Sequence, residues 1–295
     1  VLTTYKNKVY QMPINLETIN SFYNVNLKPF EVDNFLRKEI QKEDIREPVN
    51  FEEKAVTLIG RPLYEAFIKG YTMKQWQTDP VNLPAAILNR LPFRKNYNES
   101  YYFDRWQGIP YNGYTAIFEK LLSDKKIHVQ LNTDYFNIKE QLPVDALLIY
   151  SGPIDQFFNY KYGKLDWRTL DFEEEIIEVE DFQGTSVMNF AEYSIPYTRV
   201  HEPRHLHPER DYGKEKTMII KEYSRPDDGN APYYPVNNEK NQKLILQYKK
   251  LAESLENVII SGRLGDYKYY DMHHTIKIAL DKFEEIKKTL HERSA

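Results

Sequence analysis

The spacing of apolar residues changes from a two-residue period to a helical period early in the chain. Residues 1–15 predict two short extended segments around a polar turn at Lys6-Asn7-Lys8. From Pro29 to about Trp76 apolar positions recur every three to four residues, as in amphipathic helices. Within this stretch Leu63, Phe67 and Tyr71 form a stripe at spacing four. The first third of the chain therefore predicts a helical subdomain.

Strand and helix patterns alternate in the remainder of the chain. Apolar runs at residues 127–131 and 144–150 predict strands, and the second of them predicts a buried one. Residues 170–223 alternate and are rich in β-forming side chains, which is typical of an antiparallel sheet. A helix at 239–256, a strand at 258–260 and a last helix from about Asp271 follow. The whole pattern predicts a mixed α/β (α+β) protein.

Composition narrows the possible functions. The 295 residues include 40 basic and 44 acidic side chains, and no stretch is basic enough to predict a nucleic-acid partner. The absence of cysteine excludes disulfides, thiolate catalysis and cysteine-held metals, and it fits a cytoplasmic location. No apolar run approaches the length of a bilayer span, so we expect no membrane partner.

One short motif suggests a metal site. The string His201-Glu202-Pro203-Arg204-His205 matches His-Glu-x-x-His, with His207 as a candidate third ligand. In zinc hydrolases this motif needs both histidines one turn apart on a helix. Pro203 would lie within that turn, and residues 194–200 have an extended pattern. A zinc hydrolase is therefore the weaker alternative, and we predict no metal site.

Several longer strings occur in one order along the chain. They are Ile68-Lys69-Gly70-Tyr71-Thr72, Lys74-Gln75-Trp76, Arg90-Leu91-Pro92, Ser151-Gly152-Pro153-Ile154-Asp155, Pro196-Tyr197-Thr198-Arg199, Pro232-Tyr233-Tyr234-Pro235-Val236-Asn237 and Gly262-Arg263-Leu264. Their order and spacing over essentially the whole chain resemble the UDP-galactopyranose mutases. The resemblance implies a cytoplasmic isomerase of cell-surface polysaccharide biosynthesis that interconverts UDP-galactopyranose and UDP-galactofuranose. The sequence does not predict the oligomeric state, and a homodimer is the candidate assembly.

The resemblance implies a flavin mechanism. In the family, reduced FAD attacks the anomeric carbon, expels UDP and holds the opened sugar as a covalent iminium until the furanose closes. The protein positions the sugar and stabilises the departing diphosphate. Arg90 and Arg199 match the two arginines that grip this diphosphate, a role suited to a charged fork of donors. Judged from the residues alone, Arg94 rivals Arg90, and Arg90 and Arg199 could each instead form a surface ion pair.

Other matches concern the substrate. Phe67, Tyr71, Thr72 and Trp76 match the helix and loop that receive uridine. Phe67 has an alternative place in the core, because it lies four residues after Leu63. The remaining matches are expected near the phosphates or the hexose, and they are Tyr101, Asn189, Tyr234 and Tyr269. Any of these four could instead have a purely structural role.

The matches expected at FAD are Gly152, Gly262, Arg263, Asp271 and Met272. Gly262 and Arg263 follow a predicted strand, so backbone amides and a guanidinium could meet the cofactor diphosphate there. The helix that begins near Asp271 favours negative charge on reduced flavin. The alternatives are a turn for Gly152, a carbonyl contact for Arg263 and an N-cap for Asp271.

The sequence departs from the family in one large respect. No Gly-x-Gly-x-x-Gly follows a strand anywhere in it, although the family uses this fingerprint to bind FAD. We therefore expect a truncated chain that lacks its N-terminal dinucleotide-binding segment and binds FAD poorly by itself. A non-catalytic UDP-sugar-binding remnant is the second reading. A smaller departure is Gln77, where the family usually has glycine after the tryptophan of a mobile loop. The choice between galactose and N-acetylgalactosamine stays open.

The fold expected from the resemblance is an incomplete Rossmann-like FAD-binding domain with a helical subdomain and an antiparallel sheet domain. The expected division is an extended segment of the sheet domain at 1–28, the helical subdomain with its mobile loop at 29–110, part of the FAD-binding domain at 111–152, the antiparallel substrate-binding sheet at 153–237 and the C-terminal part of the FAD-binding domain at 238–295.

Overall fold

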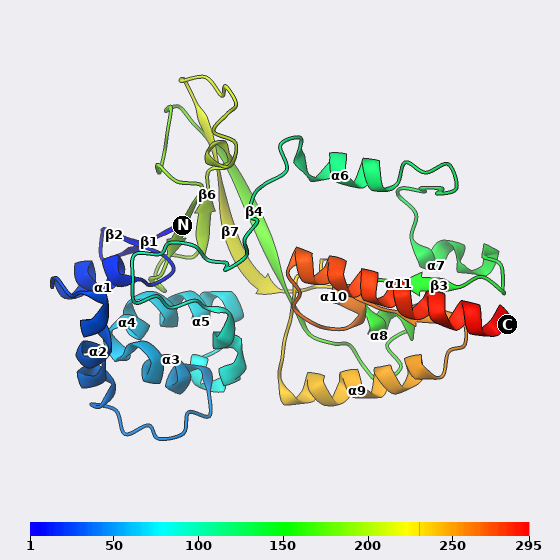
Figure 1. The fold of residues 1–295 in the computed structure, drawn as a ribbon, viewed down its shortest axis with the longest axis horizontal. Helices are drawn as coiled ribbons and strands as arrows, with labels where there is room; N and C mark the ends of the chain where they lie inside the picture. Colours follow the sequence, from blue (N-terminus) through cyan, green and yellow to red (C-terminus); the bar gives the residue numbers. More distant parts are fainter. Residues whose placement is uncertain (230, 295) are drawn as a thin grey trace. The chain divides into compact units, whose positions relative to one another are not determined.

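The computed structural model describes residues 1–229 and 231–294, without the side chains of Arg90 and of residues 289–294. The chain forms two compact units, one made of residues 1–120 and 170–225 and the other of residues 121–169 and 226–295 (Figure 1). Helices and strands occur in both units, which confirms the mixed α/β class. The division into five segments stays a prediction. Within the described range, no helix combines the length and apolarity that a membrane crossing needs.

The first unit begins with a β-hairpin. Strands β1 (Leu2–Tyr5) and β2 (Lys8–Gln11) pair antiparallel. Lys6 and Asn7 in the turn have φ of 49° and 60°, the left-handed values that a tight two-residue hairpin turn requires. This hairpin confirms the two extended segments predicted at the start of the chain.

A run of helices follows the hairpin. The longer ones are α1 (Leu16–Tyr23), α2 (Val32–Ile40), α3 (Phe51–Ile59), α5 (Gly70–Trp76) and α6 (Gly113–Leu121). The shorter ones are η1 (Pro29–Glu31), α4 (Arg61–Leu63), the π-helix η2 (Tyr64–Lys69), η3 (Pro80–Asn82) and η4 (Ala85–Arg90). Pro62 lies in the first turn of α4, where its missing N–H costs no helical bond. The predicted helical stretch from Pro29 to Trp76 is confirmed.

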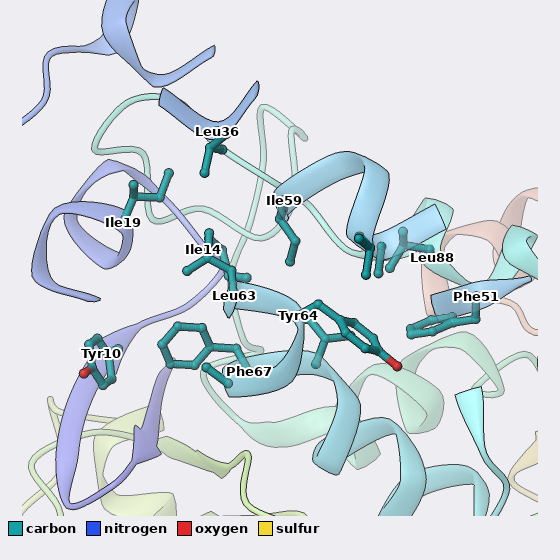
Figure 2. Packing of buried hydrophobic residues seen from close by; sticks show 14 of the residues in the cluster. Tyr10, Ile14, Ile19, Leu36, Phe51, Ile59, Leu63, Tyr64, Phe67 and Leu88 are labelled. Carbon is teal, nitrogen blue, oxygen red and sulfur yellow. The ribbon is translucent and has the colours of Figure 1, made fainter. Parts of the chain in front are cut away.

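The core of the first unit lies between these helices and the first hairpin (Figure 2). Tyr64 and Leu63 are fully buried, and Phe51 is 1% exposed. The ring of Phe67 packs edge-on against those of Tyr10 and Phe22, with centroids 5.0 and 5.4 Å away. Burial of such large apolar side chains fixes η2 and α5 against the hairpin.

A sheet completes the first unit. Its strands follow the order β2-β1-β5-β6-β7-β4, with β4 at Trp167–Ile177, β5 at Val187–Phe190, β6 at Arg199–His201 and β7 at Thr217–Pro226. Strand β5 pairs parallel with β1 and antiparallel with β6, and β6 pairs antiparallel with β7. The predicted antiparallel sheet is therefore confirmed for β5, β6 and β7. The short helix η6 (Pro203–Leu206) follows β6.

The second unit is built around a small parallel sheet. Strands β3 (Leu148–Tyr150) and β9 (Val258–Ile260) pair parallel, while β8 (Tyr234–Pro235) pairs antiparallel with the first residues of β4. The helices are α7 (Tyr135–Ile138), η5 (Lys139–Gln141), α8 (Ile154–Phe157), α9 (Glu239–Glu253), α10 (Gly262–Gly265) and α11 (Met272–Ser294). The predicted helix–strand–turn–helix order at the C-terminal end is confirmed.

One predicted strand is wrong, and another is shorter than predicted. Residues 127–131 form no strand, and their apolar side chains Ile127, Val129 and Leu131 are exposed. The run predicted at 144–150 gives a strand only from Leu148, and Val144 is 98% exposed. Alternation or apolarity alone cannot make a strand, because a strand also needs a neighbour for its backbone hydrogen bonds.

Candidate functional site

Three polar side chains lie in register across the sheet of the first unit. Asn189 of β5 is directly opposite Arg199 of β6, which in turn is directly opposite Glu222 of β7. Residues opposite each other on neighbouring strands project from the same face of a sheet. We call Asn189, Arg199 and Glu222 the arginine row. The sheet therefore brings together two of the predicted substrate residues, Asn189 and Arg199.

Glu222 fixes the position of the arginine. Its Oε1 lies 3.1 Å from Arg199 Nε, and its Oε2 lies 3.0 Å from His201 Nε2. Thr198 Oγ1 also donates to Oε1 over 3.2 Å. The Glu222 side chain is only 4% exposed, whereas 29% of the Arg199 side chain is exposed. A buried carboxylate thus holds a guanidinium that still reaches the surface, and a guanidinium is a strong hydrogen-bond donor to anions.

Helix α5 adds an aromatic side chain to the row. Arg199 Nη2 donates to the hydroxyl of Tyr71 over 2.6 Å, so Tyr71 contacts the arginine predicted to bind diphosphate. Thr72 is buried, and Trp76 is half-buried at the end of the helix. Phe67 lies in the core with an exposed fraction of 3%. A core position is the alternative that the spacing of Phe67 from Leu63 predicted. A direct contact of Phe67 with uridine stays a prediction.

The second predicted arginine cannot be compared with the first. Arg90 ends η4, and its side chain lies outside the described residues. Its rival Arg94 is 8% exposed and donates from Nη2 to the carbonyl of Ser100 over 3.1 Å, with Phe103 stacked 3.9 Å from its guanidinium. Arg94 is therefore engaged in contacts within the protein. Tyr101 is 39% exposed, and its ring contacts that of Tyr102.

The two tyrosines of the second unit that are expected near the substrate lie together. Tyr234 and Tyr269 stack with centroids 5.1 Å apart and planes 5° from parallel. Tyr269 is 39% exposed. Such a pair offers hydroxyl donors beside an apolar face, which suits a phosphate or sugar.

The residues expected at FAD follow the parallel strands. Gly152 follows β3 and Gly262 follows β9, and the last residues of these strands, Tyr150 and Ile260, are register partners. Both glycines therefore lie beyond the carboxyl ends of adjacent parallel strands, where open α/β sheets bind nucleotides. Helix α11 begins at Met272, directly after Asp271, and Met272 is 63% exposed. These positions fit a dinucleotide cofactor.

Three of these residues also have structural contacts. Arg263 donates to the carbonyls of Tyr233 and Pro232, the latter over 3.0 Å, as its alternative reading proposed. A Cβ on Gly152 would collide with the Tyr150 ring, so local packing also favours glycine there. Gly262 has a φ of 92°, which favours glycine at the turn into α10.

The histidine motif lacks the geometry of a zinc hydrolase. His201 lies in β6 and His205 in the short helix η6. His201 Nε2 contacts Glu222, whereas His205 Nε2 lies 3.1 Å from Asp181 Oδ1. Glu202 is fully buried and accepts hydrogen bonds from the amides of Phe182 and Gln183 and from the Thr217 hydroxyl. Glu202 of the motif thus holds the backbone at Phe182 and Gln183. The two histidines contact different carboxylates.

Sequence reasoning missed Glu222. No local pattern marks it, since its role comes from lying opposite Arg199 in a neighbouring strand, and strand register is not readable from spacing.

The chain is similar to UDP-galactopyranose mutases over most of its length. A family model described as UDP-galactopyranose mutase matches residues 66–269. The chain is 41% identical over 286 residues to a probable UDP-galactopyranose mutase of Klebsiella pneumoniae, covering 97% of this chain and 73% of the relative. It is 36% identical over 281 residues to the dTDP-fucopyranose mutase of Escherichia coli, covering 94% of this chain and 74% of the relative.

A solved structure shares the fold. The crystal structure of a reduced UDP-galactopyranose mutase matches with a TM-score of 0.54 at 12% identity, covering 91% of this chain and 73% of that chain. At this identity the likeness concerns the fold alone.

Proposed function

The chain belongs to the UDP-galactopyranose mutase family, and we propose that it binds a uridine diphosphate sugar and interconverts its pyranose and furanose forms. UDP-galactopyranose and UDP-galactofuranose are the proposed pair. The observation that carries this proposal is the arginine row, in which Arg199 is held between Glu222 and Tyr71.

The arginine row explains how the protein can assist departure of UDP. A guanidinium stays charged at all physiological pH values and presents several donors in one plane. Because Glu222 and Tyr71 fix Arg199 in advance, little reorganisation is needed when negative charge develops on the leaving diphosphate. Asn189, which lies opposite Arg199 in the neighbouring strand, is the proposed hexose contact. Tyr71 and Trp76 of α5 are the proposed uridine contacts.

The cofactor we propose is FAD in its reduced form. When bound, reduced FAD supplies the nucleophile for the anomeric carbon. Gly262 and the amino end of α11 at Asp271 and Met272 are the residues of this chain that would hold it. The sequence contains no Gly-x-Gly-x-x-Gly after a strand, so we expect weak FAD affinity for these 295 residues alone.

A second function has its own support. A non-catalytic UDP-sugar-binding protein needs contacts to uridine and diphosphate but no FAD fingerprint, and the fingerprint is absent from this sequence. One relative is named dTDP-fucopyranose mutase, so its name gives a different nucleotide base and a different sugar. The substrate test therefore includes dTDP-fucopyranose beside the UDP sugars.

The experiment is a turnover assay under dithionite. The chain is incubated with FAD and with either UDP-galactofuranose or dTDP-fucopyranose, and the products are separated by chromatography. UDP binding to each sample is measured by calorimetric titration. A parallel sample also receives the residues of the Klebsiella pneumoniae relative that this chain does not cover. We expect UDP-galactopyranose in the supplemented sample and little or none with oxidised FAD.

The outcomes separate the two functions. UDP binding without turnover in either sample would favour the non-catalytic protein. Stoichiometric FAD recovered with the chain alone would contradict the expected weak affinity. Absence of UDP binding in every sample would refute both functions.

A further inference from the structure

Helix α5 sits directly on the connection between β5 and β6. A Cβ on Gly70 would collide with the carbonyl of Ala191 and would lie 2.9 Å from the amide nitrogen of Tyr193. Backbone therefore packs against backbone at this point, which only glycine allows without displacement. Ala191 and Tyr193 follow directly after β5. We call this contact the α5 seat, formed by Gly70, Lys74 and residues 190–197.

Lys74 lies one turn after Gly70, on the same face of the helix. Its side chain is buried, with an exposed fraction of 7% for the residue. The Nζ group donates to the carbonyl of Phe190 over 2.6 Å and to that of Tyr197 over 2.8 Å. One ammonium thus joins both arms of the β5–β6 hairpin to α5.

The two carbonyls belong to the strands of the arginine row. Phe190 ends β5, directly after Asn189, and Tyr197 lies two residues before Arg199. The hairpin closes between them through the bond from the Phe190 amide to the Thr198 carbonyl, 2.9 Å long. Lys74 itself lies between Thr72 and Trp76 in the helix proposed to receive uridine. Its bonds therefore connect the proposed uridine contacts with the proposed diphosphate contact.

We propose that Lys74 is a positioning residue that holds α5 and the β5–β6 hairpin in one alignment, so that uridine and diphosphate contacts bind the same UDP molecule. This assignment rests on the proposed UDP binding. Lys74 does not touch the ligand in this account and acts through the carbonyls of Phe190 and Tyr197. A buried ammonium is costly to desolvate. An apolar side chain would fill the same space without that cost but would leave both carbonyls unpaired.

The test uses isothermal titration with UDP on the full chain. Lys74→Met keeps the unbranched side chain as far as Cε and removes the Nζ donors, and we expect about a tenfold or greater loss of affinity. Lys74→Gln keeps two N–H donors without charge, and we expect affinity within about threefold of the wild type. Lys69→Met is the control, because Lys69 Nζ bonds Glu65 at the surface of the preceding turn. It should bind UDP as the wild type does.

A double-mutant cycle separates alignment from general stability. When Arg199→Met has already removed the diphosphate contact, Lys74→Met should weaken UDP binding by less than about threefold. An equal loss with and without Arg199 would overturn the proposal, and so would wild-type affinity of folded Lys74→Met. Failure of the wild type to bind UDP is a different result, which refutes the proposed function itself and this assignment with it.

A second variant covers the case that Lys74→Met does not fold. Gly70→Ala disturbs the same α5 seat and leaves Lys74 intact. We expect about a tenfold loss of UDP affinity for the folded variant, measured below its melting temperature. Folded Gly70→Ala with unchanged affinity would overturn the proposal.

Discussion

Glu222 is the residue on which the position of Arg199 depends. Its buried carboxylate contacts Arg199, His201 and Thr198 at once. Removing one partner lowers the free energy of unfolding by more than the whole set of contacts contributes to it. The reason is that the remaining buried polar groups are left without hydrogen-bond or charge partners. Arg199 would also lose its counter-charge, and with it the preorganisation that the proposed function uses.

We predict that Glu222→Gln lowers the free energy of unfolding by about 2 kcal/mol and weakens UDP binding. The amide keeps the size of the carboxylate, so loss of charge rather than loss of packing is the cause. Urea unfolding and UDP titration measure the two effects. Glu174→Gln, on the exposed part of β4, is the matched control. Equal behaviour of the two variants would contradict the role given to Glu222.

Lys74 makes stability depend on pH in the alkaline range. Burial lowers the pKa of Lys74 from 10.5 to about 8, an effect that nearby Glu192 partly opposes. Between these two values the unfolded chain binds more protons than the folded chain at this residue. Stability contributed by Lys74 therefore rises as the pH rises through this window.

We predict that the wild type gains about 2 kcal/mol in unfolding free energy relative to Lys74→Met when the pH is raised from about 7.5 to about 9.5. Using the difference between the two proteins removes the contribution of other titrating groups. Chemical unfolding at the two pH values measures it. A difference that stays constant or falls with pH would show that the ammonium is not held in a desolvated position.

At the scale of elements, the turn from β9 into α10 depends on Gly262. Its φ of 92° lies in the region that side chains with a Cβ rarely adopt. We predict that Gly262→Ala lowers the free energy of unfolding by about 1–2 kcal/mol. Gly108→Ala is the control, because a Cβ at Gly108 meets nothing within 4 Å. Equal melting temperatures for the two variants would contradict this account of the turn.

The elements that the sequence predicts well are those with a strong local signal. The turn at Lys6-Asn7-Lys8 and the stripe through Leu63 and Phe67 are examples, and both are present in the structure. Helix α1 was not predicted, although Asn15 and Thr18 form a reciprocal capping box at its start. The helix has only 8 residues, so its pattern of apolar positions repeats too few times to be recognised in the sequence.

Non-local contacts account for the remaining differences. Residues 127–131 have a strand-like pattern but form no strand. The resemblance indicated Asn189 and Arg199 as site residues, but only the register of β5, β6 and β7 places them beside Glu222. Lys74 likewise acquires its role through carbonyls 116 and 123 residues away. Spacing along the chain carries no information on such pairs.

For the whole molecule, the division into two units places the predicted residues in two groups. Arg199, Asn189 and the α5 residues belong to the first unit, while Tyr234, Tyr269 and the residues expected at FAD belong to the second. Each unit has its own buried cluster, around Tyr64 in the first and around Tyr248 in the second. The proposed diphosphate contact can therefore be tested on residues of the first unit, without the cofactor.

The most direct test is calorimetric titration of the wild type and Arg199→Met with UDP and with uridine. The account predicts that the wild type binds UDP at least about tenfold more tightly than uridine, and that Arg199→Met removes this preference while its affinity for uridine is unchanged. A wild type that does not distinguish UDP from uridine, or a variant that keeps the preference, would contradict the claim that Arg199 holds the diphosphate.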